Sequence, residues 1–453
     1  EAAAAPEGYE CKKAIGFEGM QYHLSLSGMD CTGCGVCVKA CPAKALSMQP
    51  FEPVRDTMKA NWAYSTEKVT EKTIPEKQKT TVKGSQFLKP YVEFSGACAG
   101  CGETPYIKMI TQLYGDHMRI ANSAGCTHIW GGSPEIPFCT NDRGQGVAWA
   151  SGLFEDTAEY GYGMMLGTSA VRKWLRAEVE QLLPSADAEL QAAAEACLAG
   201  WDDSHGTRER ADRLVAALER VDSDAARTIL QRKDYLFKPS QWIVGGDGWA
   251  YDIGYGGLDH VIASGENVNI ICLDTEVYSN TGGQSSKATP TAAVAQFAAS
   301  GKKTKKKDLG MMCMSYGYVY VAQVAMGYDP QQTLNAIREA EAYDGPSLII
   351  AYAPCINHGI KGGMSNSQLR AKQAVEAGYW HCYRYNPELR GEGKNPFSLD
   401  SKAPTGSFRD FLMGEVRYSS LYRKFPEIAD QLFAKAQRDA EERTETYLRL
   451  AGK

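Results

Sequence analysis

Two segments in the middle of the chain carry residues that suit a divalent metal ion bound to a diphosphate. Residues 245–248 read Gly-Gly-Asp-Gly, and residues 274–284 form a loop rich in hydroxyl and carbonyl oxygens. Mg²⁺ prefers octahedral oxygen coordination, usually from one or two protein groups together with phosphate oxygens. Asp247 can supply a carboxylate, Thr275 a hydroxyl and Val277 a main-chain carbonyl. The two segments therefore predict a magnesium–diphosphate site.

The elements that flank these segments would bring them together. A strand is predicted over residues 241–245 and another over 268–274, with a helical stretch between them. In such a βαβ unit the strands run parallel, and their carboxyl ends meet at the edge where open α/β sheets bind ligands. Gly246 and Gly248 would let the backbone approach phosphates, whose charge a helix N-terminus favours. The alternative is a pair of ordinary turns in an α/β domain.

Four cysteines near the N-terminus have the spacing C-x₂-C-x₂-C-x₃-C-P: Cys31, Cys34, Cys37 and Cys41. Bacterial ferredoxins hold 4Fe–4S clusters with this run. A structural zinc site is the alternative, but it would more often offer two pairs of ligands. In two-cluster ferredoxins the fourth cysteine ligates the other cluster, and no second run exists here. Cys41 therefore either closes a single cluster or serves one whose other ligands lie on another segment or chain.

A second group of cysteines lies near glycines at predicted element boundaries: Cys98, Cys101, Cys126 and Cys355. Four thiolates from three loops at one sheet edge would form a 4Fe–4S site beside the diphosphate site. By itself, the pair Cys98 and Cys101 could also be a zinc knuckle or a redox pair. His128 and His358 are expected to play hydrogen-bonding or structural roles. Core thiols are predicted at Cys139, Cys197, Cys272, Cys313 and Cys382.

Residues 274–284, Asp-Thr-Glu-Val-Tyr-Ser-Asn-Thr-Gly-Gly-Gln, together with Gly246-Asp247-Gly248, resemble the thiamine diphosphate (TPP) fingerprint. Thr275 stands where many TPP enzymes have Asn. With this departure and its cysteines, the chain resembles the C-terminal portion of the pyruvate:ferredoxin (flavodoxin) oxidoreductase family, which acts on 2-oxoacids. The resemblance implies the same four ligands for a cluster near TPP. It also implies the following cofactor-binding residues: Glu103, Cys126, Gly246, Asp247, Gly248, Trp249, Thr275, Glu276, Val277, Tyr278, Ser279 and Asn280.

This resemblance implies oxidative decarboxylation of pyruvate with coenzyme A to acetyl-CoA and CO₂, with electrons passing through 4Fe–4S clusters to ferredoxin or flavodoxin. Asn280 is the candidate for contact with the substrate. The family places a pyrimidine-binding domain upstream, so this chain alone is not expected to turn over, and the complete enzyme is expected to be a homodimer. The alternatives are an oxidoreductase for another 2-oxoacid, such as 2-oxoglutarate, and a non-catalytic iron–sulfur electron-transfer module. Glu103 has an alternative role as a carboxylate at a helix N-terminus, where the helix dipole would stabilise its charge. This role is compatible with contact to the cofactor.

Length and composition allow a soluble protein of two or three domains: 453 residues, 43% hydrophobic and 23% charged, with net charge −5. The charge gives no indication of nucleic-acid binding, and no apolar run or signal peptide suggests a membrane or secretion, so a cytoplasmic protein is expected.

The predicted fold class is α/β. Three parts are expected: an incomplete ferredoxin-like module at 1–72, a TPP-binding parallel-sheet domain at 73–400 and a helical segment at 401–453.

Three other segments have recognisable patterns. Residues 170–232 predict a helical excursion, broken near Pro184 and at 200–206. The lysine-rich run 301–308 is expected to be a solvated loop, with contact to coenzyme A phosphates or an acidic ferredoxin as a hypothesis. From about residue 405 the tail reads as helical. It is expected to offer another subunit or domain an apolar face made of Phe411, Leu412, Leu421, Tyr422 and residues 425–432.

Overall fold

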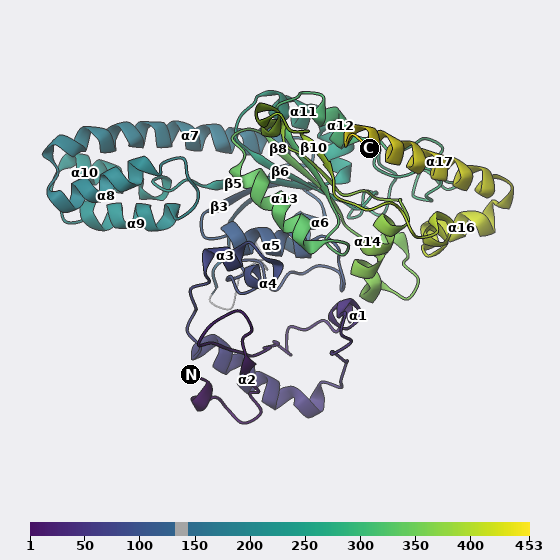
Figure 1. The fold of residues 1–453 in the computed structure, drawn as a ribbon, viewed down its shortest axis with the longest axis horizontal. Helices are drawn as coiled ribbons and strands as arrows, with labels where there is room; N and C mark the ends of the chain where they lie inside the picture. Colours follow the sequence, from purple (N-terminus) through teal and green to yellow (C-terminus); the bar gives the residue numbers. More distant parts are fainter. Residues whose placement is uncertain (132–143) are drawn as a thin grey trace.

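A central eight-stranded sheet organises the chain in the computed structural model, which describes residues 1–131 and 144–453 (Figure 1). Its strand order is β10-β9-β7-β8-β6-β5-β3-β4. The strands are β3 (Met118–Asn122), β4 (Ala148–Ser151), β5 (Ser240–Gly246), β6 (Asn269–Asp274), β7 (Tyr320–Val324), β8 (Ser347–Tyr352), β9 (Tyr383–Tyr385) and β10 (Phe397–Leu399). All pairings from β4 to β7 are parallel, which confirms the predicted α/β parallel sheet. The antiparallel extension through β9 and β10 was not predicted.

Helices cover both faces of the sheet, which explains why its central strands are apolar without alternation. Every residue of β6 and β8 is buried. Trp242 and Val244 of β5 face one hydrophobic cluster, and Ile243 faces the other. The first face packs against α5 (Thr104–Tyr114), α6 (Cys126–Gly131) and α13 (Pro330–Ala342). The second packs against α7 (Thr157–Leu182), α11 (Tyr255–Ala263) and α12 (Leu309–Met314).

The register aligns the carboxyl ends of the central strands. Asn122 of β3 is level with Val244 of β5, and Asp274 of β6 is level with Tyr352 of β8. The segments that follow these strands therefore emerge side by side at one edge, as predicted for the βαβ unit. These segments contain Cys126, Asp247, Thr275 and Cys355.

The predicted helical excursion forms an arm beside the sheet (Figure 1). It begins earlier than expected, because α7 starts at Thr157 and runs for 26 residues. The remaining helices are α8 (Ala188–Ala199), α9 (Thr207–Leu218) and α10 (Asp224–Leu230). A separate hydrophobic cluster joins them to the end of α7. The breaks lie where expected, at the turn containing Pro184 and between α8 and α9.

The N-terminal part lies below the sheet domain in Figure 1 and has little regular structure. It contains a two-stranded ladder, β1 (Lys12–Lys13) with β2 (Gln21–Tyr22), and the short helix α1 (Val36–Ala40). Three helices follow: α2 (Arg55–Glu67), α3 (Glu76–Lys79) and α4 (Val82–Ser85). No residue of α2 is buried.

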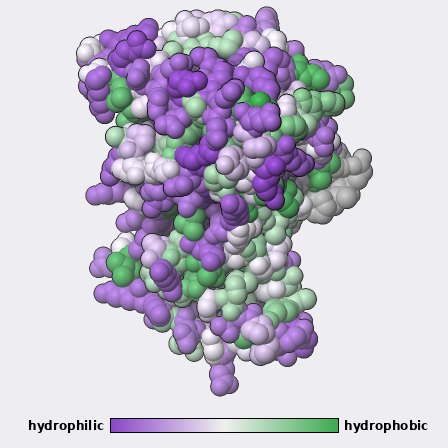
Figure 2. Space-filling model, turned by 90° about the vertical axis from the view of Figure 1, so that its right-hand side faces the viewer, coloured by the Kyte–Doolittle hydropathy of each residue, from purple (hydrophilic) through white to green (hydrophobic). Residues whose placement is uncertain are grey.

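The C-terminal helices are α14 (Ser367–Glu376), α15 (Phe408–Met413), α16 (Val416–Lys424) and α17 (Pro426–Leu450). Their apolar residues were expected to face another subunit or domain, and most of them face this chain's own sheet domain. Phe411, Leu412, Leu421 and Leu432 are buried in this chain's own core, because the helices pack back onto the sheet domain. Tyr422 and Phe425 remain exposed. The face that these helices present in Figure 2 is mainly hydrophilic, with scattered hydrophobic residues. Within the described residues, no helix combines the length and hydropathy needed to cross a membrane.

Candidate active site

A cleft of about 210 Å³ lies at the carboxyl ends of β3, β5 and β6. It combines the Gly-Asp-Gly turn, the oxygen-rich loop and one cysteine from the second group. Its lining residues are Glu103, Ala124, Gly125, Cys126, Phe154, Gly246, Asp247, Gly248, Val277, Tyr278, Ser279, Asn280 and Thr281. A concave site with a few convergent polar groups at this edge of a sheet is the expected place for a ligand.

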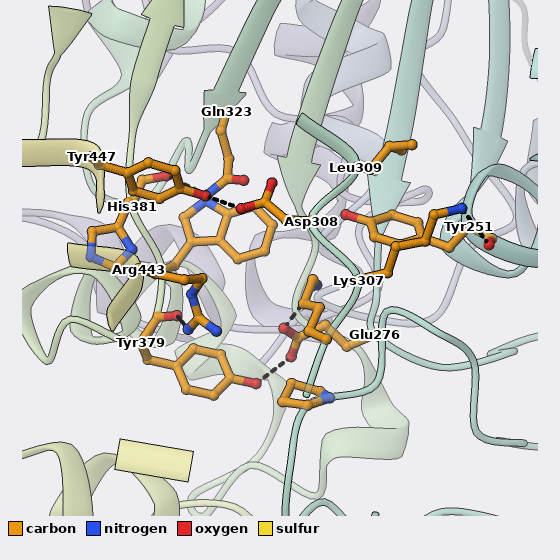
Figure 3. A pocket seen from close by; sticks show the side chains of 13 residues that line it. Tyr251, Glu276, Lys307, Asp308, Leu309, Gln323, Tyr379, His381, Arg443 and Tyr447 are labelled. Atoms are coloured by element: carbon orange, nitrogen blue, oxygen red, sulfur yellow. Dashed lines mark hydrogen bonds and ion pairs between the residues drawn. The ribbon is translucent and has the colours of Figure 1, made fainter. Parts of the chain in front are cut away.

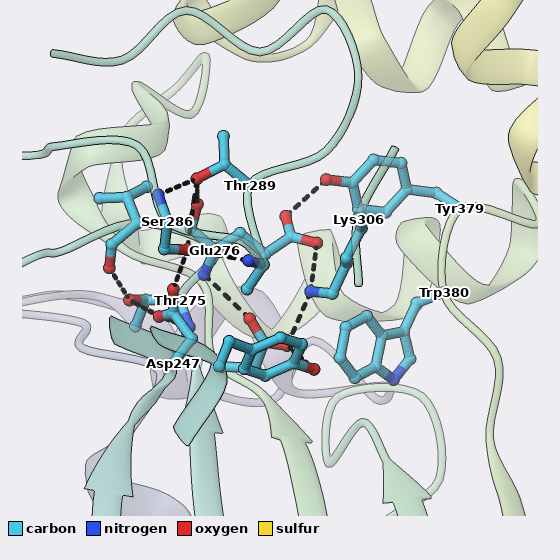
Figure 4. Close-up of polar contacts among 12 residues, drawn as sticks. Asp247, Thr275, Glu276, Ser286, Thr289, Lys306, Tyr379 and Trp380 are labelled. Carbon is cyan, nitrogen blue, oxygen red and sulfur yellow. Dashed lines mark hydrogen bonds and ion pairs between the residues drawn. The ribbon is translucent and has the colours of Figure 1, made fainter. Parts of the chain in front are cut away.

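The three predicted magnesium ligands lie in mutual contact. Asp247 Oδ1 accepts hydrogen bonds from Thr275 N at 3.2 Å and from Thr275 Oγ1 at 3.0 Å. Thr275 Oγ1 is also 3.0 Å from the Val277 carbonyl oxygen. Ser286 Oγ, which was not predicted, donates to Asp247 Oδ2 at 2.6 Å (Figure 4). One carboxylate, one hydroxyl and one carbonyl, all oxygen donors, fit Mg²⁺.

The electrostatics of Asp247 also fit a cation. Its side chain is fully buried, and burial together with the charge of Asp274 raises the pKa of Asp247 to about 8. A bound divalent cation would favour the ionised carboxylate and offset that cost. Asp274 is neutralised by its pair with Lys306, whereas the contacts of Asp247 are hydrogen bonds, which leaves its carboxylate suited to a cation.

The two loops approach so closely that Gly248 has no room for a side chain. A Cβ atom added there would lie 2.6 Å from the ring of Tyr278. Trp249, which was expected to bind the cofactor, is fully buried beneath this turn and does not line the cleft. Its indole ring packs against Gly245 and Gly254.

Glu276 is also directed away from the cleft. Its backbone lies in the left-handed region (φ 60°), a costly conformation for a residue with a side chain. Its carboxylate pairs with Lys306 at 3.1 Å and accepts a hydrogen bond from Tyr379 (Figure 4). It also pairs with Arg417 at 2.9 Å. Burial opposes ionisation, but the two cations outweigh it and lower the pKa of Glu276 to about 2. Glu276 therefore holds the loop between Thr275 and Val277 in place.

Lys306 corrects the expectation of a solvated lysine-rich loop. Its side chain is only 12% exposed and pairs with Asp274 at 2.7 Å as well as with Glu276. The neighbouring cavity, seen in Figure 3, measures about 30 Å³. That volume suits one or two water molecules and is far too small for a cofactor. Burial of Lys306 follows from two carboxylates that lie near it only in the tertiary structure.

The four cysteines of the second group come from three loops that pack against each other. Gly102 N donates to the Pro354 carbonyl at 3.1 Å, which joins the Cys101 loop to the Cys355 loop. Polar groups approach the sulfurs: Glu103 N donates to Cys101 Sγ at 3.4 Å, and Ser279 Oγ lies 3.2 Å from Cys126 Sγ. These contacts are of the kind that surround cluster thiolates.

The thiols also influence each other electrostatically. Burial, with added repulsion from Glu103 and other cysteines of the group, raises the pKa of Cys126 to about 12 and that of Cys355 to about 11. Within the described residues no three His, Cys, Asp or Glu side chains are grouped as for a single metal ion. A 4Fe–4S cluster spaces its cysteines more widely, because each sulfur binds a different iron. Four thiols from three loops offer one ligand for each iron of such a cluster.

The N-terminal cysteine run has a backbone suited to a cluster. Gly33 and Gly35 adopt positive φ angles of 65° and 74°. Around Cys41, hydrogen bonds from the backbone N–H groups that follow it lower the pKa of the thiol, with Ala45 N at 3.4 Å from the sulfur. Gly35 packs on Ser365, while Gly100 packs on Met364, so the same short segment contacts both cysteine groups.

Glu103 stands immediately before α5, but its side chain makes no capping hydrogen bond. Instead, Trp130 Nε1 donates to Glu103 Oε2 at 2.8 Å. The carboxyl group is buried in the wall of the cleft, and burial raises the pKa of Glu103 to about 7 despite the Trp130 hydrogen bond. Below that pH, the neutral acid could donate a hydrogen bond into the cleft.

This shift predicts a pH-dependent effect of Glu103→Gln on the cofactor-free protein. The pKa is raised from 4.5 to about 7 in the folded state, so folding stability falls as pH rises through this range. Glutamine cannot ionise, so the variant should be more stable than wild type by about 3 kcal/mol at pH 8, with the gain shrinking towards pH 5. Urea unfolding at both pH values measures this. The exposed control Glu155→Gln should change stability by less than about 0.5 kcal/mol at either pH. An equal gain in stability at both pH values for Glu103→Gln would contradict the raised pKa of Glu103.

Comparison with known proteins finds clear relatives of this chain. Residues 236–351 match the model of the thiamine pyrophosphate enzyme, C-terminal TPP binding domain, and residues 29–47 match the 4Fe-4S binding domain. The chain is 59% identical over 456 residues to the pyruvate-flavodoxin oxidoreductase of Klebsiella pneumoniae and 58% identical over 466 residues to the pyruvate:ferredoxin oxidoreductase of Moorella thermoacetica. It is homologous to the C-terminal region of these oxidoreductases.

Both alignments cover 99% of this chain and 39% of the relative, so the chain spans about two fifths of the pyruvate oxidoreductases it matches. The predicted TPP-binding domain and 4Fe–4S module are confirmed. The mitochondrial pyruvate dehydrogenase (NADP(+)) of Euglena gracilis is 44% identical over 456 residues, which cover 99% of this chain and 25% of that relative. The relatives of this region are thus named for different electron acceptors.

Four of the predicted core thiols are buried as expected: Cys197, Cys272, Cys313 and Cys382. Cys139 lies outside the described residues. Sequence reasoning missed Ser286 and the structural role of Lys306. A serine or lysine in a loop has no distinguishing pattern, and the nearest signal in the sequence is the oxygen-rich loop that ends at Gln284.

Proposed function

We propose that this chain is the part of a pyruvate:ferredoxin or pyruvate:flavodoxin oxidoreductase that binds the diphosphate of TPP and carries iron–sulfur clusters. The complete enzyme would convert pyruvate and coenzyme A to acetyl-CoA and CO₂ and pass electrons to ferredoxin or flavodoxin. The observation that supports this most directly is the shared wall of the cleft, where Asp247 and Cys126 lie together. When bound, TPP supplies an electron sink for decarboxylation.

In this proposal the chain's residues bind and orient the cofactors. Asp247, Thr275 and the Val277 carbonyl hold Mg²⁺, and Gly246 and Gly248 leave space for the diphosphate. The other residues proposed to contact the cofactor are Glu103, Cys126, Tyr278, Ser279 and Asn280. Cys98, Cys101, Cys126 and Cys355 hold a cluster beside the cleft, and Cys31, Cys34, Cys37 and Cys41 serve the ferredoxin-like module. Glu276 and Trp249 do not line the cleft and instead support the two loops that form it.

The remaining assignments are proposals about the whole enzyme. The division into parts at 1–72, 73–400 and 401–453 follows the change from cysteine run to sheet to helices. A pyrimidine-binding part outside this segment would complete the cleft, and the complete enzyme would be a cytoplasmic homodimer.

Asn280 is proposed as the side chain that reaches the substrate. It is exposed and lines the cleft beyond the metal ligands. Asn280→Ala in the complete enzyme should lower kcat by ~10²-fold, the order expected for loss of one well-placed hydrogen-bond donor, with TPP affinity unchanged. Steady-state kinetics and TPP titration measure the two effects. Thr281→Ala, a change to the next residue of the same loop, is the control. A loss of TPP affinity in Asn280→Ala would assign Asn280 to cofactor binding instead.

The proposal is tested by measuring iron, acid-labile sulfide and TPP per chain in the complete enzyme after anaerobic purification. TPP together with iron for at least two clusters is expected. The same preparation should reduce ferredoxin or flavodoxin when given pyruvate and coenzyme A, and should do so faster than with 2-oxoglutarate. Zinc in place of iron, or iron without TPP in active preparations, would refute the assignment. Faster reaction with 2-oxoglutarate would reassign the substrate.

A further inference from the structure

A buried histidine joins the loop of one cluster cysteine to the loop of the metal ligands. His358 is fully buried at the end of a single 3₁₀ turn, Ile356–His358, that begins directly after Cys355. Its Nδ1 accepts a hydrogen bond from the backbone N–H of Cys355 at 3.4 Å. Its Nε2 lies 2.7 Å from the carbonyl oxygen of Thr275. The imidazole thus spans two loops whose sequence positions are 80 residues apart.

The two hydrogen bonds specify one form of the ring. Because Nδ1 accepts from Cys355, the proton of the neutral ring resides on Nε2 and is donated to Thr275 O. The turn itself has little freedom, since Gly359 follows in the left-handed conformation (φ 63°) and a Cβ there would lie 2.5 Å from Val416. Charged groups near the ring are Arg417, Glu415 and Glu276, which belong to the network that holds the metal loop. The imidazole ring of His358 is therefore held in one orientation and connects the two loops through specific hydrogen bonds.

We propose that His358 is a positioning residue that couples the diphosphate site to the neighbouring cluster. Its bond to Thr275 orients a proposed metal ligand, and its bond to Cys355 orients a proposed cluster ligand. Occupation of one site should therefore alter the other, and by linkage the effect is reciprocal. The inference rests on the proposed function, because it needs both cofactors.

Three substitutions separate the two ends of the connection. His358→Phe keeps the ring but removes both hydrogen bonds. His358→Gln places an amide donor near the position of Nε2, and His358→Asn places a carbonyl acceptor near the position of Nδ1. His381→Gln is the matched control, since His381 is also buried and hydrogen-bonded, to Thr444 Oγ1 at 2.8 Å, but contacts neither loop.

The experiment uses the complete enzyme, purified anaerobically and depleted of TPP. It measures the Kd for TPP in the presence of Mg²⁺, and the EPR spectrum and midpoint potential of the clusters before and after TPP addition. In wild type, TPP should shift the signal of one cluster. In His358→Phe the Kd should rise ~10-fold, as for loss of other groups that orient metal ligands, and the TPP-dependent shift should disappear. His358→Gln should retain more of the TPP affinity than His358→Asn.

The outcomes distinguish this proposal from the function it rests on. A wild-type enzyme that binds no TPP would refute the proposed function itself. Wild-type binding with an unchanged Kd and a preserved TPP-dependent shift in His358→Phe would overturn the role of His358 alone. If His358→Phe does not fold, equal Kd values and equal spectral shifts in the Gln and Asn variants would overturn it. The same losses in His381→Gln would show a general effect of removing a buried histidine and would also overturn it.

Discussion

Asp247→Ala in the complete enzyme is expected to abolish retention of TPP and Mg²⁺ and, with it, pyruvate-dependent electron transfer. The carboxylate is the one charged group among the proposed metal ligands, and it also organises the site, since it accepts hydrogen bonds from Thr275 and Ser286. Loss of groups that merely orient a metal ligand costs 10–100-fold in affinity, so loss of a direct ligand should weaken TPP binding by ~100-fold or more. Iron and sulfide per chain should stay at wild-type values.

TPP and Mg²⁺ content, measured beside iron content after gel filtration, tests this expectation. Asp259→Asn is the matched control, because Asp259 lies on the next helix, α11, and accepts a hydrogen bond from Tyr316 at 2.8 Å, and neither residue lines the cleft. It should retain TPP. Asp247→Asn keeps the shape of the side chain and distinguishes lost charge from lost packing: it should fold as wild type and still fail to hold Mg²⁺. Wild-type TPP affinity in both Asp247 variants would exclude this metal site.

Lys306→Met is expected to lower the free energy of unfolding by about 3–5 kcal/mol, the range for removing one partner of a buried ion pair. The substitution keeps an unbranched side chain, one atom shorter, but leaves Asp274 without its cation and Glu276 with Arg417 as its one cation. Burial already raises the pKa of Asp274, so the unpaired carboxyl group would be protonated or would draw in water. The strained backbone of Glu276 would lose one of its anchors, and TPP affinity should fall as well.

Urea unfolding of the cofactor-free protein measures the stability change, and TPP titration of the complete enzyme measures the functional one. Lys305→Met is the control from the same lysine run. Lys305 is 66% exposed and lies 3.6 Å from Glu442, an exposed contact worth about 0–1 kcal/mol. Equal unfolding midpoints for the two variants would show that Lys306 makes no buried pair in solution.

The local patterns along the chain determined the chemistry of this protein. A run of cysteines at ferredoxin spacing and a Gly-Asp-Gly turn one βαβ unit before an oxygen-rich loop are short, contiguous signals. Each specifies a ligand type through residue identity and spacing alone. Apolar runs such as residues 268–274 also predicted the parallel strands, because a strand covered on both faces needs no alternation. These features identify Asp247, Thr275 and the cysteines from the sequence alone.

The tertiary structure decided which neighbours complete the site. Lys306 looked like one of several solvated lysines, and Glu276 like a cofactor contact, since the sequence does not show which way a loop side chain points. Only the folded chain brings Asp274, Arg417 and Tyr379 around them. The apolar residues of the C-terminal helices were equally ambiguous, because an amphipathic helix shows that one face is buried but not against which partner. Long-range packing settles such questions, and it alone placed His358 between the two loops.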